Sequence, residues 1–137
     1  MRNHALKLGW AALIGCLLLL AAGVLAAKEA DRLGRWVGAW EGAGSGGSFE
    51  LTLARGADGT LTGKVEVGQD TGDYSAAFKA VTLEGDRLNA RYDFPPDNQA
   101  EIVLDGNFNG ADVSGTWSLV APGTNESFAA GSWTVKQ

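Results

Sequence analysis

Residues 48–67 alternate apolar and polar side chains on both sides of a short turn that contains Asp58 and Gly59. A period of two is typical of a β-strand with one buried face. Two such runs joined by a glycine-containing turn predict a β-hairpin over this stretch. The apolar positions are Phe49, Leu51 and Leu53 before the turn, and Leu61, Val65 and Val67 after it.

The same alternation recurs to the end of the chain, and no helical periodicity follows residue 33. Asn109-Gly110 is the dipeptide most typical of a two-residue hairpin turn. Gly131 is expected to mark a bulge or bend in the last strand. The expected strands are 34–41, the two halves of 48–67, 76–83 with mixed facing, 87–94, 100–108, 111–120 and 126–136.

Eight antiparallel strands with short connections predict an all-β domain. Eight is also the number that closes into a small up-and-down barrel. Closure removes the exposed edges that an open sheet would carry. A β-sandwich of the same strands remains the alternative, because both folds alternate inward and outward residues.

The first 26 residues differ in kind from the rest. Arg2 and Lys7 precede an almost wholly apolar run, and small residues follow at a cleavage position. This pattern predicts a signal peptide over residues 1–26 and export to the periplasm or the cell exterior. Two alternatives stay open, a retained membrane anchor over residues 8–25 and a lipoprotein modified at Cys16. The expected order is then a short polar segment over 27–33, helical for one turn or frayed, and a barrel domain over 34–137.

Cleavage would also remove the only cysteine, Cys16, and the only histidine, His4. The mature domain would then lack the residue types for a Ser-His-Asp triad, a cysteine nucleophile or a His/Cys zinc site. It would keep 9 basic residues against 16 acidic ones, a formal net charge of about −7. An acidic surface repels phosphate backbones, which argues against a nucleic-acid partner. We therefore expect a non-catalytic domain with no cofactor and no metal, and with membrane contact only through an uncleaved N-terminal segment.

The remaining chemistry lies with carboxylates. Glu50, Glu66, Asp93 and Glu101 occupy the polar phase of their strands and are expected to face water. The residues from 105 to 110 match the first half of a calcium loop, D-x-N-x-N-G, but position twelve of that loop holds a threonine. A hairpin turn with hydrogen-bonding side chains explains this stretch better.

Gly38-Ala39-Trp40, followed by Phe49 and the run 54–63, resembles the opening of avidin and streptavidin, and a Gly-x-Trp on the first strand resembles the lipocalin pattern. The similarity covers residues 34–67 and, more loosely, 114–134. It implies a calycin-type small barrel, as in other bacterial exported domains.

The resemblance does not extend to the biotin ligands of avidin. The position of the ligand asparagine two residues after the first-strand Trp holds Gly42, and the positions of the ligand Tyr and Ser hold Val65 and Val67. A polar ligand left without these hydrogen-bond partners would bind far more weakly. We therefore expect no biotin binding.

The aromatic residues supply the candidate binding positions. A small apolar or aromatic ligand inside the barrel would be lined by Trp40, Val65, Val67, Tyr92 and Trp117. Trp36 and Trp133 are taken to differ in phase from Trp40 and Trp117 and to reach the surface, where they would offer an interaction patch together with Tyr74.

These positions support three hypotheses. The first is an exported binding domain for a small apolar ligand. The second is a protein-interaction or inhibitor domain of the cell envelope that uses its rim and an outward Trp. The third is an accessory carbohydrate-binding module. An interior cavity would favour the first hypothesis, and a solid core would count against it.

Overall fold

The computed structural model describes residues 30–137. The chain divides into two units, Met1–Arg32 and Leu33–Gln137, and the second unit contains the whole sheet. Residues 30–32 have helical backbone, in agreement with the helical turn expected within 27–33. The predicted signal peptide, with its anchor and lipoprotein alternatives, lies outside the described residues.

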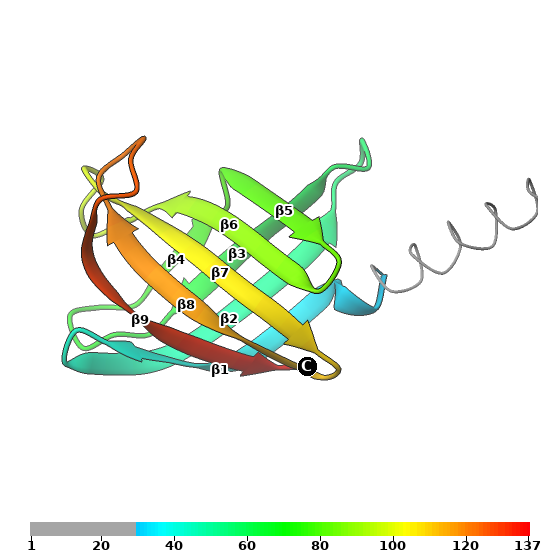
Figure 1. The fold of residues 1–137 in the computed structure, drawn as a ribbon, viewed down its shortest axis with the longest axis horizontal. Coiled ribbons are helices and arrows are strands. Elements are labelled where there is room, and N and C mark those ends of the chain that lie inside the picture. The colour runs from blue at the N-terminus through cyan, green and yellow to red at the C-terminus, as the bar shows by residue number, and fades with distance from the viewer. Residues whose placement is uncertain (1–29) are drawn as a thin grey trace, which may run out of the picture. The chain divides into compact units, whose positions relative to one another are not determined.

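Nine antiparallel strands form one sheet in the order β4-β3-β2-β1-β9-β8-β7-β6-β5. Strands adjacent in sequence pair with each other, except β4 and β5, and the first strand also pairs with the last. Since β4 and β5 are the two ends of the sheet and do not pair, the expected full closure of the barrel is not reached. The sheet curls around a common interior, as Figure 1 shows, so the expected all-β, barrel-like fold is confirmed and the two-sheet sandwich is not observed over residues 30–137. The strands are β1 (Gly34–Gly42), β2 (Ser45–Arg55), β3 (Leu61–Val67), β4 (Tyr74–Ala77), β5 (Ala80–Glu84), β6 (Arg87–Asp93), β7 (Glu101–Asn109), β8 (Asp112–Val120) and β9 (Ser127–Lys136).

The ninth strand arises because the expected strand over 76–83 is divided in two. The amide of Phe78 donates to the Gly63 carbonyl of β3, and the next amide, of Lys79, donates to the Arg91 carbonyl of β6, both at 2.9 Å. The chain therefore changes its partner strand between adjacent residues. Lys79 and Ala80 are both exposed, which shifts the alternation by one position and accounts for the mixed facing of this segment.

The interior is solidly packed at the end where β2 joins β3 and β7 joins β8. Trp36 packs edge-on against Phe108 there, with ring centroids 5.3 Å apart. Deeper in the barrel, the ring of Trp133 lies 5.4 Å from that of Phe49. The alternation of the opening hairpin holds, since Phe49, Leu51, Leu53, Val65 and Val67 are all buried.

The expectation that Trp36 and Trp133 reach the surface is wrong, because each is only 1% exposed. Trp36 and Trp40 are four residues apart on one strand, so their side chains point to the same face. Their burial differs with depth along the barrel rather than with face.

Gly131 does not mark a bulge, as was expected, but a point of close backbone contact between strands. It pairs with Gly42 of β1 and Trp117 of β8, and the register shift in β8–β9 lies instead between Leu119 and Val120. A methyl group at position 131 would overlap the Glu41 carbonyl oxygen and come within 2.5 Å of Trp117 Nε1. The bare backbone lets β1, β9 and the Trp117 ring meet at this point.

Candidate functional site: a pocket at the open end of the barrel

The opposite end of the barrel is hollow. A cavity of about 190 Å³ lies among the C-terminal ends of β1, β3, β6 and β8 and the N-terminal ends of β2, β4, β7 and β9. In Figure 1 this is the end that carries the loop between β8 and β9. The lining residues are Trp40, Gly42, Ala43, Ser45, Phe49, Val67, Gln69, Tyr74, Tyr92, Phe94, Ile102, Trp117, Leu119 and Ala129.

Two tryptophans form part of the wall with their polar atoms already bonded. Trp40 and Trp117 pack edge-to-face with centroids 5.7 Å apart. Trp40 Nε1 donates to the Gly68 carbonyl and Trp117 Nε1 donates to the Glu41 carbonyl, both at 2.9 Å. The indoles therefore present hydrocarbon to the pocket, while their N–H groups tie β1 to its surroundings.

Two tyrosines supply a polar feature in this wall. The hydroxyls of Tyr74 and Tyr92 are 2.8 Å apart and form one hydrogen bond. Tyr74 also packs edge-on against Phe94, with centroids 5.6 Å apart, and Phe78 stacks on Tyr92. Burial raises the pKa of both phenols, so both remain protonated at neutral pH.

Four of the five predicted ligand-lining residues lie in the pocket wall, namely Trp40, Val67, Tyr92 and Trp117. The fifth, Val65, lies two residues before Val67 on β3 and is fully buried in the packed core. Tyr74, expected to belong to a surface patch, lines the pocket and is bonded to Tyr92.

The remaining lining residues were not predicted as a site. Phe94, just after β6, and Ile102 and Leu119 follow the inward alternation expected from the sequence, whereas in β9 the inward residue is Ala129 and not Ala130, which was expected to face inward. How deep each of these residues lies along the barrel could not be predicted from the alternation, because depth depends on the register between strands.

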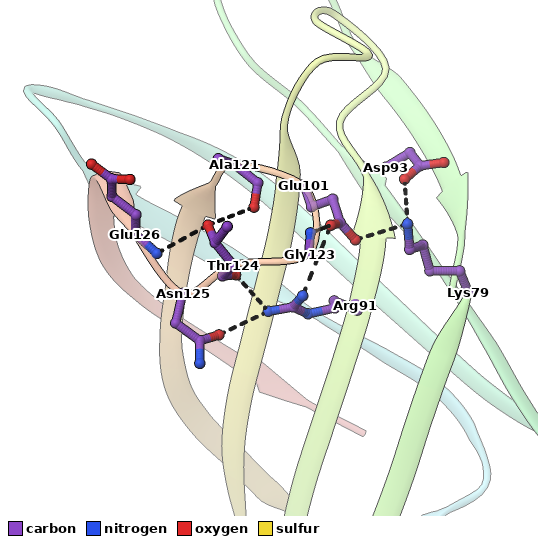
Figure 2. Close-up of polar contacts among 9 residues, drawn as sticks. All are labelled: Lys79, Arg91, Asp93, Glu101, Ala121, Gly123, Thr124, Asn125 and Glu126. Atoms are coloured by element: carbon purple, nitrogen blue, oxygen red, sulfur yellow. Dashed lines mark hydrogen bonds and ion pairs between the residues drawn. The ribbon is translucent and has the colours of Figure 1, made fainter.

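The expectation that Glu101 faces water is wrong. Its side chain is 2% exposed and lies at the start of β7, between Lys79 and Arg91 (Figure 2). Its Oε2 lies 2.8 Å from Lys79 Nζ, and its Oε1 lies 3.8 Å from Arg91 and accepts a hydrogen bond of 2.9 Å from the Gly123 amide. The hydrogen bonds from Lys79 and Gly123 lower the pKa of Glu101.

This polar cluster fastens the loop over residues 121–126 to the barrel wall. Arg91 donates to the Thr124 carbonyl at 3.2 Å and to Asn125 Oδ1 at 3.0 Å, as Figure 2 shows. The loop joins β8 to β9 just beyond Leu119 and Ala129, which face each other across the two strands and line the pocket. The cluster therefore holds the loop that follows this part of the pocket wall.

The stretch with the calcium-like motif lies within strand β7 and the turn after it. Asp105 accepts a hydrogen bond from Asn89 at 2.9 Å and lies 3.6 Å from Arg87. Within residues 30–137 no group of three or more His, Cys, Asp or Glu side chains is arranged to hold a metal ion. The described residues also include no helix long and apolar enough to cross a membrane.

A second hollow, of about 410 Å³, opens to solvent beside β2, β3 and β4. Its walls carry Glu50, Glu66 and Asp73, and Glu50 forms an ion pair with Arg35. The acidic groups lie on an open surface, whereas the first cavity is more enclosed and mainly apolar. The cavity at the barrel end is therefore the better candidate for a binding site.

No protein-family model, curated protein or solved structure matches this chain. The candidate site is therefore argued from its geometry alone.

Proposed function

We propose that this domain binds a small apolar or aromatic molecule in the open end of its barrel. The observation that carries the proposal is the cavity of about 190 Å³ walled by Trp40, Trp117, Tyr74 and Tyr92. An apolar protein cavity of about 150 Å³ is enough to hold benzene, so this space suits a single ring with a short substituent.

The composition of the wall favours an apolar ligand over a sugar. A sugar ring carries several hydroxyls that each need a hydrogen-bond partner. The wall offers few polar side chains, namely Ser45 and Gln69 in addition to the two tyrosines. Both indole N–H groups are used by backbone carbonyls. We therefore rank the carbohydrate-binding hypothesis below the apolar one.

The interaction-domain hypothesis has less support from its own residues. Trp36 and Trp133 are buried, and the large apolar side chains that are exposed are Val37 and Phe128, the latter 64% exposed. Exposed apolar residues that occur singly are common on soluble proteins and do not by themselves mark an interface.

The test is an NMR titration of the isotope-labelled domain with toluene, and with glucose in parallel. Toluene is expected to shift the signals of Leu119, Ala129 and the Trp40 indole, and to leave that of Val113 at the packed end unchanged. Glucose is expected to shift none of them. If toluene leaves the pocket signals unmoved, the proposal is wrong.

A matched pair of variants separates the pocket from the outer surface. Ala129→Phe places a ring in the cavity and is expected to weaken toluene binding at least tenfold. Ala130→Phe adds the same ring to the next residue, which is exposed, and is expected to leave the affinity unchanged. Equal affinity in the two variants would contradict binding in this pocket.

A further inference from the structure

The Tyr74–Tyr92 pair contains one hydroxyl hydrogen that has no acceptor within the pair. Two phenols carry two O–H groups, and the hydrogen bond between Tyr74 and Tyr92 uses one of them. Among residues 30–137 neither hydroxyl has another hydrogen-bond partner. One O–H group therefore remains available as a donor in a wall that is otherwise mainly hydrocarbon.

The surroundings of this donor carry no compensating charge. None of the pocket's lining residues in the described part of the chain is Lys, Arg, Asp or Glu. The ion-paired cluster around Glu101 sets two carboxylates, Glu101 and Asp93, against two cations, Lys79 and Arg91, and so carries no excess charge. An anionic ligand would lose its hydration without gaining an opposite charge.

We propose that the pocket selects neutral ring compounds that carry one hydrogen-bond acceptor, which receives the spare O–H group of the Tyr74–Tyr92 pair. The proposal rests on the proposed function and names the chemical class of its ligand. An aryl ketone fits this class. An aryl hydrocarbon lacks the acceptor, and an aryl carboxylate carries a charge that the wall cannot neutralise.

Three probes of nearly equal shape test the selection, namely acetophenone, ethylbenzene and benzoate at pH 7. Their dissociation constants are measured by NMR titration in the wild type and in the double variant Tyr74→Phe/Tyr92→Phe. Removing both hydroxyls together leaves no unpaired phenol and keeps both rings, so the fold is expected to persist. Comparing each probe between the two proteins cancels the different hydration of ketone and hydrocarbon.

In the double variant acetophenone is expected to bind about fivefold more weakly than in the wild type, as for the loss of one ordinary hydrogen bond. Ethylbenzene is expected to change less than twofold. The single variant Tyr92→Phe leaves Tyr74 with its proton unpaired and is expected to bind acetophenone within twofold of the wild type. Benzoate is expected to bind the wild type at least tenfold more weakly than acetophenone.

A hydroxyl on the outer face serves as the control. Thr62→Val removes such a group from β3, where it bonds the Ala54 carbonyl, and is expected to change no probe's affinity. If the double variant binds acetophenone as tightly as the wild type while ethylbenzene still binds both, the ligand class is wrong but the binding pocket stands. Tight binding of benzoate would also overturn the ligand class. If no probe binds, the ligand class and the proposed function both fail.

Discussion

Glu101 shows how a single charged residue can be buried on a strand that otherwise alternates. Lys79 reaches it from the junction of β4 and β5, and Gly123 reaches it from the loop between β8 and β9. A buried carboxylate is tolerated when charges and donors surround it, and removing such partners leaves unsatisfied groups behind. The residue thus links two connections that lie 44 positions apart in the chain.

We expect Glu101→Gln to lower the free energy of unfolding by about 1–3 kcal/mol, because an ion pair and a charge-assisted hydrogen bond are lost. Glu84→Gln removes an exposed carboxylate and is expected to change stability by less than about 0.5 kcal/mol. Urea unfolding of the three proteins measures both effects. Equal losses in the two variants would show that the Glu101 cluster does not stabilise the fold.

The difference in stability between the wild type and Glu101→Gln is also expected to depend on pH. The pKa of folded Glu101 lies below its ordinary value of 4.5, so its contribution is complete above that pH and is lost as the pH falls through the folded pKa. The stability difference between the wild type and Glu101→Gln is therefore expected to stay constant from pH 7 to pH 5 and to shrink below about pH 4.5. Thermal unfolding from pH 7 to pH 3 measures it, and a difference that grows in acid would contradict the assignment.

At the scale of elements, the backbones of β1 and β9 and the Trp117 side chain of β8 approach one another closely next to the pocket. Trp117 donates to the Glu41 carbonyl at 2.9 Å, and Gly131 leaves room for both groups. The pocket wall therefore depends on a glycine that does not itself line the cavity.

Gly131→Ala is expected to destabilise the domain by about 1–3 kcal/mol, since the added methyl group overlaps the Glu41 carbonyl and crowds the indole. Gly56→Ala is the control. Its added group would come within 3.1 Å of Oδ1 of the exposed Asp58 side chain but no closer than 3.5 Å to any backbone atom beyond its chain neighbours, so a much smaller change is expected. Chemical unfolding provides the comparison, and a neutral Gly131→Ala would mean that the strands separate there without cost.

At the scale of the whole molecule, the barrel is filled at one end and hollow at the other. Leu104 is fully buried in the core, whereas Leu119 is partly buried and borders the cavity. The two leucines lie on neighbouring strands of one sheet. They differ in whether the space around them is already occupied.

We expect Leu104→Ala to cost about 2–5 kcal/mol, because it leaves a sealed cavity in a packed core. Leu119→Ala is expected to cost about 1–2 kcal/mol. The removed atoms border open space, so the main loss is the free energy gained by burying their apolar surface away from water. This variant should also admit a larger ring, measured by titration with naphthalene against toluene. Equal destabilisation by the two truncations would show that the pocket collapses in solution.

Local alternation could be read without tertiary information. It identified the all-β fold and the inward positions of the opening hairpin, because the period of two is a property of the extended backbone itself. It also placed Trp40, Val67, Tyr92 and Trp117 on the inward face, where they line the pocket. It could not separate Val65 from them, since both core and pocket residues occupy that face.

By itself, then, the sequence determined the strand periodicity and the inward face of most strands. Only the tertiary structure decided where the chain changes partner at Phe78 and Lys79, that Trp36 and Trp133 are buried, and that Glu101 is enclosed by charges from distant segments. It also decided which end of the barrel stays hollow. The physical reason is that these features depend on register and on contacts between residues far apart in the chain, which a local pattern of side chains does not encode.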